Sequence, residues 1–365
     1  MLAGGLGQRL SPLTKVLPKP MVPMAGRPLI EYVIGPLLRQ GFGRVIVAAK
    51  YIGQVIARHF EGREGVEVRI LDSRDTADAV RLLLDELGGE ALVTMGDVLT
   101  NADYAEIVGF HHRVGADATI ALKSVDNPLQ YGLVLVDRGN RITLFTEKPA
   151  GIELYLLSLA YHRAMGFSLH SNLINMGIYV LSRDALELLR SEPDLMDFGR
   201  HVFPFMVEHG YRLYGWIAPP ETYWEDVGRL ASYKRALWDL LAGEVPGLRP
   251  SGEPVGPNAY VERDAEVLGS LVPPVYVGRG CLVERGAVVG PFASLEGDCH
   301  VGEGSRVQYS SVWWGARVEG HSFVHDSVIM DGARIKGSRV LSSVVGSGRV
   351  VAEDLKEEVV EPVAA

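Results

Sequence analysis

The sequence lacks the features of a disulfide-stabilised or membrane-spanning protein. It holds only two cysteines in 365 residues, which is too few for a disulfide framework. It has no apolar run of about eighteen residues and no charged-then-apolar leader, so neither a membrane helix nor a signal peptide is indicated. We therefore expect a soluble, cytoplasmic protein that binds no membrane. Its length and its 47% of apolar residues are enough for two domains with large cores.

Acidic residues are nearly absent from the first fifty positions, although the whole chain has a net charge of −9. Glu31 is the one carboxylate in this stretch, and the basic residues are Arg9, Lys15, Lys19, Arg27, Arg39, Arg44 and Lys50. A positive segment in an acidic chain suits a small anionic ligand and argues against a nucleic-acid groove.

Two common glycine motifs for nucleotides are also missing. Gly5-x-Gly7 is followed by Leu10 where a dinucleotide fingerprint needs a third glycine, and Arg27 stands near the position of its acidic ribose ligand. No G-x-x-x-x-G-K-[ST] phosphate loop occurs in the chain.

Residues 2–34 contain a different phosphate-binding pattern. Glycines at positions 4, 5 and 7 allow a sharp turn and bring backbone N–H groups close to a ligand. Arg9 can clamp phosphate oxygens, and Lys19 adds a point charge on a backbone restricted by a proline on each side. A glycine turn among solvated charges is the alternative, but the combination favours a site for a triphosphate or a sugar phosphate.

Through these glycines, Arg9 and the Pro-Lys-Pro sequence, the segment resembles the signature of sugar-1-phosphate nucleotidylyltransferases, L-A-G-G-x-G-T-R-L followed by P-K-P. The resemblance covers nearly the whole chain and implies a Rossmann-like nucleotidyltransferase fold with Arg9 and Lys19 as catalytic residues. It also implies nucleotide binding by Leu2, Ala3, Gly4, Gly5, Gly7 and Gln8, the last of which replaces the usual Thr.

Up to about residue 242, buried apolar runs alternate with helical patterns. The runs predict strands at 44–49, 66–71 and 90–95, and the patterns predict helices at 51–60 and 76–87, with Thr76 as an N-cap of the second. This alternation predicts an α/β fold with a mostly parallel sheet and helices on both faces. Gly35-Pro36 is expected to end or kink the first long helix. Only Met1-Leu2-Ala3 precede the glycines, so we expect a natural start a few residues upstream.

From about residue 257 a six-residue rhythm replaces this alternation. Aliphatic residues recur every six positions, with one five-residue step, at Val277, Val283, Val289, Leu295, Val301, Val307, Val312, Val318 and Val324. Small residues follow four positions later, at Cys281, Ala287, Ala293, Cys299, Ser305, Ala316 and Ser322. Such repeats build a parallel β-helix with aliphatic side chains inside and small ones at the corners. The family resemblance implies a left-handed coil.

These patterns predict a catalytic domain at 1–242, a Gly- and Pro-rich linker at 243–256, a β-helix at 257–352 and a tail at 353–365. Because the end coils and flat faces of the β-helix otherwise stay exposed, we expect a homo-oligomer. Cys281 and Cys299 are expected on adjacent coils, as buried thiols rather than a disulfide.

Two carboxylates are candidates for a metal site. Asp97 follows a buried strand and so lies at the sheet edge where ligands of α/β folds bind. Asp226, in Trp224-Glu225-Asp226-Val227-Gly228, precedes another helix. Two carboxylates and substrate phosphates are a usual cage for Mg²⁺. In the resembling family, Asp97 and Asp226 match the metal ligands of the G-D and W-x-D-x-G motifs.

The remaining site residues are implied by the resemblance. Four match positions that hold the sugar phosphate, namely Gly132, Glu147, Lys148 and Asn175. The segment Asp75-Thr76-Ala77 matches the usual G-T-A at the start of a helix that meets the nucleobase. Asp75 replaces the glycine, and its carboxylate either accepts hydrogen bonds from guanine or only caps the helix.

The resemblance therefore implies transfer of a nucleoside monophosphate from a triphosphate to a sugar 1-phosphate with Mg²⁺. Similarity is greatest to mannose-1-phosphate guanylyltransferases, and glucose-1-phosphate enzymes using dTTP, UTP or ATP are the alternative. An inactive regulatory subunit keeps the same layout but loses the charged residues that this chain retains. Acyl transfer by a β-helix histidine remains a further alternative, with His300, His321 and His325 as candidates.

Overall fold

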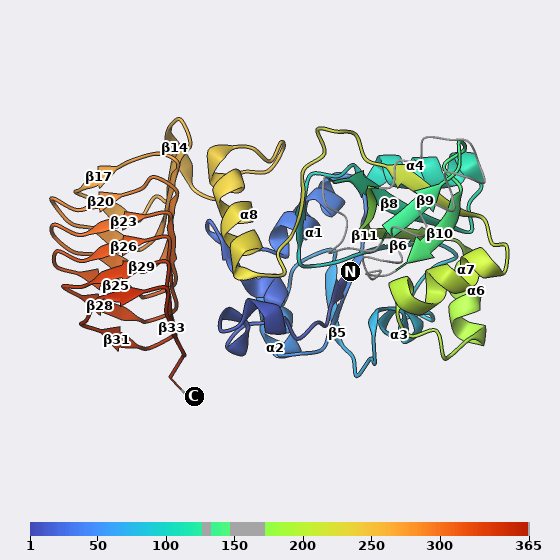
Figure 1. Cartoon of the computed structure of the whole chain (residues 1–365), viewed down its shortest axis with the longest axis horizontal. Coiled ribbons are helices and arrows are strands. Elements are labelled where there is room, and N and C mark those ends of the chain that lie inside the picture. The colour runs from blue at the N-terminus through green and yellow to red at the C-terminus, as the bar shows by residue number, and fades with distance from the viewer. Residues whose placement is uncertain (126–132, 147–171, 364–365) are drawn as a thin grey trace. The chain divides into compact units, whose positions relative to one another are not determined.

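The computed structural model describes residues 1–125, 133–146 and 172–363 (Figure 1). Its contacts divide the chain into two compact units. Unit 1 comprises Met1–Gly4, Pro36–Gly96 and Ala102–Trp224, and unit 2 comprises Gly5–Gly35, Asp97–Asn101 and Glu225–Ala365. This grouping follows contacts rather than sequence, and the predicted boundaries at residues 242 and 257 stay predictions. Within the described residues no helix is long and apolar enough to span a membrane.

Parallel strands form one part of unit 1. Strand β1 (Leu2–Ala3) pairs in parallel with β4 (Val45–Ala49), and β4 pairs in parallel with β5 (Val66–Ile70). A parallel bridge from Leu2 to Met95 joins β1 to the end of β6 (Ala91–Thr94). All five residues of β4 are buried, as expected for a strand covered on both faces. The three predicted strands and the α/β fold are confirmed.

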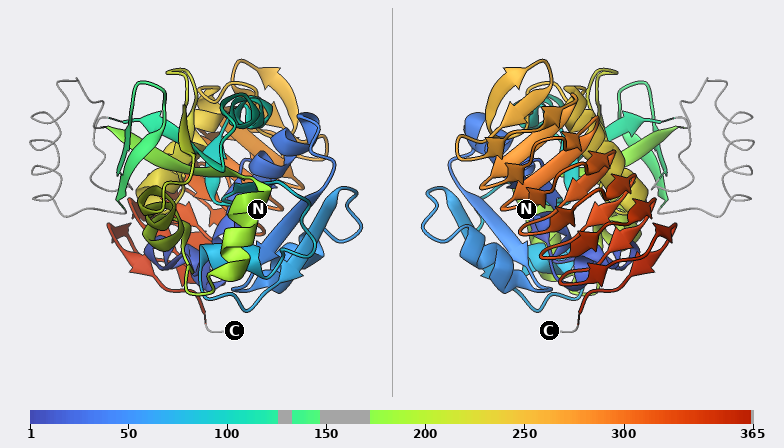
Figure 2. Two further views of the ribbon diagram at one scale, coloured as in Figure 1. Left: turned by 90° about the vertical axis from the view of Figure 1, so that its right-hand side faces the viewer. Right: turned by 90° about the vertical axis from the view of Figure 1, so that its left-hand side faces the viewer.

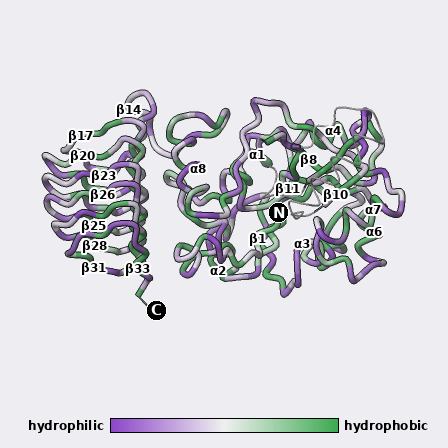
Figure 3. Tube along the Cα trace, in the orientation of Figure 1, coloured by the Kyte–Doolittle hydropathy of each residue, from purple (hydrophilic) through white to green (hydrophobic). Residues whose placement is uncertain are grey.

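An antiparallel part, which the alternation did not predict, is built around the nine-residue strand β11 (Leu173–Leu181). This strand pairs antiparallel with β6, β8 and β9. Strand β12 pairs in parallel with β8. The other strands are β8 (Ala118–Ser124), β9 (Leu133–Val136), β10 (Ile142–Thr146) and β12 (Leu213–Ile217). Hydrophobic residues run along β8 and β11 (Figure 3), as the burial of both strands requires.

Helices pack on these strands. In unit 1 they are α2 (Gly53–His59), α3 (Thr76–Arg81), α4 (Tyr104–Val114), α6 (Arg183–Ser191), the π-helical turn η5 (Phe198–Val202) and α7 (Phe203–Glu208). Helix α2 contacts β5, and α4 contacts β8 and β12. The rings of Tyr179, Phe198 and Phe203 pack together with centroids 4.9–5.6 Å apart, which ties β11 to η5 and α7.

The structure corrects the predicted limits of two helices. Of the two outcomes predicted for Gly35-Pro36, an end of the helix there is wrong, and a kink stays a prediction. Helix α1 (Glu31–Arg39) continues through Pro36, because the proline removes a single N–H donor and Val33, Ile34 and Leu37 are buried. Helix α3 ends at Arg81 rather than at residue 87, and its N-cap is Asp75, whose side chain accepts from the Thr76 N–H.

Most of unit 2 is a parallel β-helix with three long sheets (Figures 1 and 2). The first contains β14 (Glu253–Gly256), β15 (Ala259–Val261), β18 (Val275–Arg279), β21 (Ala293–Gly297), β24 (Ser310–Val312), β27 (Val328–Ile329), β30 (Val344–Val345) and β33 (Val359–Val360). The second contains β16 (Glu266–Val267), β19 (Leu282–Val283), β22 (His300–Val301), β25 (Arg317–Glu319), β28 (Arg334–Lys336) and β31 (Val350–Val351). The third contains β17 (Ser270–Leu271), β20 (Val288–Val289), β23 (Arg306–Gln308), β26 (Phe323–His325), β29 (Arg339–Leu341) and β32 (Leu355–Lys356).

The six-residue rhythm places its side chains as predicted. Every aliphatic position from Val277 to Val324 is fully buried, and the small positions are at most 1% exposed. The thiol of Cys281 lies 3.4 Å from the backbone N of Cys299, one coil and 18 residues on, and both thiols are free. Matching residues on later coils are 17, 16 and then 15 apart. The coils therefore shorten toward the C-terminus.

Helix α8 (Leu230–Ala242) packs against the first sheet of the β-helix. The hydroxyl of Tyr233 lies 3.1 Å from that of Ser311, and the indole N–H of Trp313 donates to Tyr233. Lys234 forms an ion pair with Asp326. Unit 2 also contains the short hairpin β2 (Pro23–Met24) and β3 (Arg27–Pro28). Strand β7 (Val98–Thr100) forms a two-stranded sheet with β13 (Trp224–Asp226).

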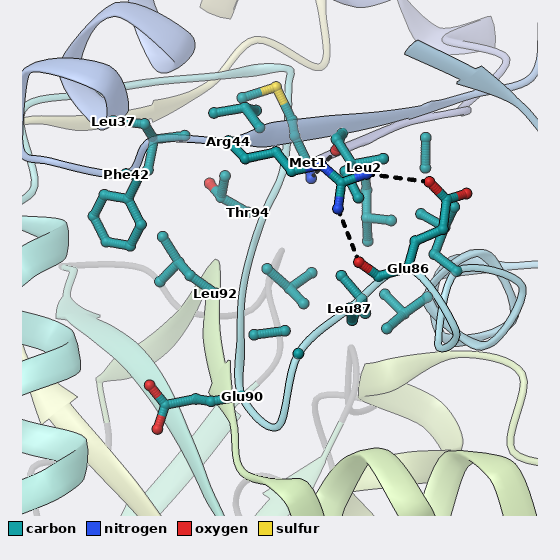
Figure 4. Close-up of a pocket in the computed structure, with 18 of the residues that line it drawn as sticks. Met1, Leu2, Leu37, Phe42, Arg44, Glu86, Leu87, Glu90, Leu92 and Thr94 are labelled. Atoms are coloured by element: carbon teal, nitrogen blue, oxygen red, sulfur yellow. Dashed lines mark hydrogen bonds and ion pairs between the residues drawn. The ribbon is translucent and has the colours of Figure 1, made fainter. Parts of the chain in front are cut away.

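Unit 1 encloses a cavity of about 310 Å³ between β4, β6 and the α3 segment (Figure 4). Its walls are mainly apolar, and the guanidinium of Arg44 donates to the carbonyl and carboxylate of Glu86 at its edge. Of the predicted site residues that the structure describes, only Leu2 lines it. This cavity is therefore not the candidate active site.

Candidate active site

Lys19 is the centre of a charged cluster within unit 2. It begins the 3₁₀ turn η3 (Lys19–Met21), and Pro18 before it and Pro20 after it fix the backbone. Its side chain is only 9% exposed. The ammonium nitrogen lies 2.6 Å from Oδ2 of Asp97 and 3.0 Å from Oδ1 of Asp226.

Local pairing brings the two carboxylates together from positions far apart in the sequence. Asp97 lies in the turn between β6 and β7, and Asp226 is the last residue of β13. Strands β7 and β13 pair, and the Val227 N–H donates to the carbonyl of Asp97 at 3.2 Å. Both carboxylates therefore contact the same Lys19 ammonium.

The electrostatics of this cluster are dominated by three charges. Burial alone lowers the pKa of Lys19, but the negative charges of Asp97 and Asp226 outweigh it, and the net shift is upward. Lys19 therefore stays charged at neutral pH. Both carboxylates keep about 30% of their side-chain surface exposed, so a ligand can reach them.

The donor set fits Mg²⁺. No group of three or more His, Cys, Asp or Glu side chains suited to a metal occurs in the part of the chain that the structure describes. A cation held by Asp97 and Asp226 therefore needs further oxygens from phosphate or water. Mg²⁺ is commonly bound in this way, with one or two carboxylates and retained waters.

The glycine-rich turn packs against the same cluster. Gly7 has φ +62°, and a Cβ there would lie 2.8 Å from Thr14 Cγ2 and 3.2 Å from Lys19 Cβ. The hydroxyl of Thr14 donates to the Gly7 carbonyl at 2.9 Å. Glycine is thus required both by the backbone conformation and by the close packing. Gly5, Gln8 and Arg9 are exposed, and the Arg9 guanidinium makes no hydrogen bond or ion pair with the described residues.

The predicted nucleotide-binding residues of unit 1 lie at two places. Leu2 and Ala3 form β1, and the Gly96 N–H donates to the carbonyl of Leu2 at 2.8 Å. Gly4 follows them, where a Cβ would lie 3.3 Å from Cβ of Lys50. Both side chains of β1 are buried, so a ligand can meet this strand only through its backbone end.

The start of α3 is engaged mainly within the protein. The hydroxyl of Thr76 donates to Asp197 at 2.8 Å, and Ala77 is fully buried, with its N–H donating to the Met196 carbonyl. Asp75 is half-buried. Burial, with the nearby charge of Asp197, raises the pKa of the Asp75 carboxyl. The structure thus shows Asp75 as a helix cap, next to a second carboxylate.

Asn175 lies at an irregularity in β11, where the register with β8 shifts between Asn175 and Tyr179. Its amide donates to the Tyr179 hydroxyl at 2.9 Å, and its oxygen accepts from the Gly177 N–H at 2.8 Å. Gly177 has φ +76°, and a Cβ there would lie 2.8 Å from Met95 Cγ. The bulge therefore holds a half-buried amide beside the end of β6.

Comparison with known proteins agrees with this geometry. Residues 1–243 match the family described as nucleotidyl transferase, and residues 271–360 match the domain described as GMPPB C-terminal domain. The chain belongs to the nucleotidyl transferase family. The predicted resemblance, the enzyme class and the β-helix are confirmed.

Relatives match along most of their length. Mannose-1-phosphate guanylyltransferase 1 of Arabidopsis thaliana is 29% identical over 343 residues, covering 90% of this chain and 84% of that protein. Mannose-1-phosphate guanylyltransferase of Mycobacterium tuberculosis is 29% identical over 323 residues, covering 86% and 81%. UTP–glucose-1-phosphate uridylyltransferase of Synechocystis is 27% identical over 347 residues, covering 87% and 84%.

Within this nucleotidyl transferase, three predicted sugar-phosphate residues, Gly132, Glu147 and Lys148, lie outside the described residues. Two structural contributors were missed from the sequence. Thr14 supports the glycine turn, and Asp197 accepts from Thr76. Neither had a local signal, because a Thr in a loop or an Asp before a helix is ordinarily read as a turn residue or a cap.

Proposed function

We propose that the protein transfers a nucleoside monophosphate from a nucleoside triphosphate to a sugar 1-phosphate and releases pyrophosphate. The observation that supports this most strongly is the Lys19 ammonium between Asp97 and Asp226. The Lys19 ammonium and the two carboxylates to which we assign metal binding meet at one point of unit 2. The family match and the names of the relatives favour the same reaction.

The reaction needs positioning and charge neutralisation more than a strong acid or base. The sugar-phosphate oxygen attacks the α-phosphorus in line, the bond to the bridging oxygen breaks, and pyrophosphate leaves with that electron pair. The exposed guanidinium of Arg9 would clamp triphosphate oxygens, and Lys19 would stabilise the charge that develops during transfer. Lys148 would hold the attacking phosphate.

Asp97 and Asp226 would hold Mg²⁺, which when bound neutralises phosphate oxygens. Lys19 already contacts both carboxylates. With that site loaded, Lys19 would give up its contact with at least one of the two carboxylates. The released ammonium would then be free to bind a phosphate. In this proposal the positive charge of Lys19 offsets the negative charges of the two carboxylates before the substrates bind.

For substrates we propose mannose 1-phosphate and GTP. Two of the relatives above carry that activity in their names, and a third is named as a uridylyltransferase of glucose 1-phosphate. Glucose 1-phosphate with dTTP, UTP or ATP is therefore the second candidate. Asn175 would bind a sugar hydroxyl, together with Gly132 and Glu147. Asp75 would accept from guanine if the base reaches α3.

An activity matrix tests the reaction and the substrates together. The purified protein is incubated with Mg²⁺, with each of four triphosphates, and with mannose 1-phosphate or glucose 1-phosphate, and pyrophosphate is measured. We expect release that depends on both substrates and is greatest with GTP and mannose 1-phosphate. No release with any pair would contradict the proposed function and favour the inactive-subunit alternative.

Acyl transfer has less support. His300 pairs with Glu284 at 2.8 Å on the β-helix, and the ring of His325 contacts those of Tyr309 and Phe323. We further propose that the enzyme acts in the cytoplasm and assembles through its β-helix. Sedimentation as a monomer at working concentration would contradict the assembly.

A further inference from the structure

A glutamate of the β-helix holds the hairpin that follows the Pro-Lys-Pro segment. Glu296, in β21, is 3% exposed. Its Oε1 accepts from the Ala25 N–H at 3.1 Å, and its Oε2 accepts from the Gly26 N–H at 2.8 Å. Ala25 and Gly26 are 271 and 270 residues away in the sequence. The carboxylate thus captures both N–H groups of one turn.

This turn is shaped to fit the β-helix. Ala25 and Gly26 both have positive φ, 50° and 91°, as in the tight turns that join hairpin strands. A Cβ on Gly26 would overlap the hydroxyl of Tyr276, which lies in β18. Two successive N–H groups in such a turn form a small anion-binding concavity. Here a side chain of the same chain occupies it.

Further hydrogen bonds hold the hairpin to the β-helix and its covering helix. The Tyr233 hydroxyl donates to the Pro23 carbonyl at 2.8 Å, and the Ser251 N–H donates to the Ala25 carbonyl at 3.0 Å. The Ser294 hydroxyl donates to Oε1 of Glu296 at 2.6 Å. Both oxygens of this buried carboxyl group therefore have hydrogen-bond partners.

The hairpin is connected to Lys19 over a very short path. The Leu29 N–H donates to the Val22 carbonyl at 3.0 Å, and the Ile30 N–H donates to the Pro20 carbonyl at 2.8 Å. Pro20 is the next residue after Lys19. A displaced turn would therefore move the backbone that aims the Lys19 ammonium between its two carboxylates.

We infer that Glu296 is a positioning residue for the active site: by holding the Ala25–Gly26 turn against the β-helix, it fixes the placement of Lys19. The inference rests on the proposed function for its effect on turnover, but not for the anchoring itself. The β-helix then has a role besides assembly, because it forms the base on which the signature segment is built.

Two variants of the full-length protein test this. Glu296→Gln keeps the shape but turns an amide N–H₂ toward a backbone N–H. Glu284→Gln is the matched control, because Glu284 is also a β-helix carboxylate that accepts a backbone N–H, from Glu303, but does not touch the hairpin. Hydrogen exchange of residues 20–30 reports anchoring without substrate, and pyrophosphate release reports turnover.

We expect faster exchange at residues 20–30 and about a tenfold lower kcat in Glu296→Gln, with neither change in Glu284→Gln. In a Lys19→Gln background, the added substitution should lower the residual kcat less than twofold, because the two residues act through one placement. If Glu296 had a purely structural role, the added substitution would lower kcat by the same factor in the wild-type and in the Lys19→Gln background.

Unchanged exchange in Glu296→Gln would overturn the anchoring, and faster exchange with normal kcat would overturn the positioning role. If the wild type turns over no substrate pair, the proposed function fails while the exchange result still decides the anchoring. If Glu296→Gln does not fold, Glu296→Asp takes its place, since it is one methylene shorter and cannot reach both N–H groups. For Glu296→Asp too, unchanged exchange would overturn the anchoring, and faster exchange with normal kcat would overturn the positioning role.

Discussion

The Lys19 ammonium lies 2.6 Å from a carboxylate oxygen of Asp97, which is 78 residues away in the sequence. Asp226 contacts the same nitrogen from a third segment. The structure thus joins a glycine-rich signature, a strand end and a second acidic motif into one charged cluster. The predictions below follow from that cluster and from its supports.

Replacing Lys19 should improve metal binding while it abolishes turnover. In Lys19→Met no ammonium competes for Asp97 and Asp226, so we expect the affinity for Mn²⁺ to rise about tenfold and kcat to fall about 100-fold. Metal binding is measured by titration calorimetry and turnover by pyrophosphate release. Lys234→Met is the control, because Lys234 pairs with Asp326 on the β-helix instead. A Mn²⁺ affinity equal to that of the wild type would contradict the proposal that Lys19 and the metal ion compete for the two carboxylates.

The stability of unit 2 should fall as the pH rises toward 7. Burial raises the pKa of Glu296 to about 7, so the folded state holds a proton that the unfolded state releases near its ordinary value of 4.5. The stability due to this proton is present at low pH and lost as pH rises through 7, up to about 3 kcal/mol. Asp331, whose pKa burial raises to about 6, acts in the same direction.

Urea unfolding between pH 5 and 8 measures this dependence. Tyr32, Tyr233, Tyr276 and Cys299 also interact electrostatically with Glu296. Burial raises the pKa of each of them, so they stay neutral in this range. Glu296→Gln should flatten the slope, while Glu284→Gln should not. An unchanged slope in Glu296→Gln would contradict the assignment.

Both cysteines should be unreactive thiols in the folded protein. Each is 1% exposed, and burial raises the pKa of Cys299 well above its usual range, so little thiolate forms. We expect no reaction with a thiol reagent under native conditions. After unfolding, two thiols should react whether or not a reductant is present. A lower count without reductant would reveal a disulfide.

Local patterns predicted much of this fold. The apolar runs located β4, β5 and β6, and the six-residue rhythm located the buried residues of the β-helix, because both depend on side-chain periodicity. The continuation of α1 through Pro36 was not predicted. The helix continues because burial of its apolar face outweighs one lost hydrogen bond, and that burial depends on tertiary packing. The antiparallel pairing around β11 was not predicted either, because pairing partners leave no local pattern.

The site was also predicted only in part, because its motifs are local patterns whereas the contacts between them are not. The motifs identified Lys19, Asp97 and Asp226 one at a time, and their order along the chain suggested a common site. The direct contact of Lys19 with both carboxylates had no sequence signal. The contact of Glu296 with Ala25 had none either, because 271 residues separate its partners. Long-range hydrogen bonds of this kind are specified by the assembled core.

The central claim is that Lys19, Asp97 and Asp226 form the catalytic centre. Its most direct test is pyrophosphate release by Asp226→Asn with GTP, mannose 1-phosphate and Mg²⁺, beside the wild type and the control Asp326→Asn. We expect kcat to fall at least about 100-fold in Asp226→Asn and to stay unchanged in the control, with thermal unfolding of both near the wild type. A normal kcat in Asp226→Asn would contradict the account.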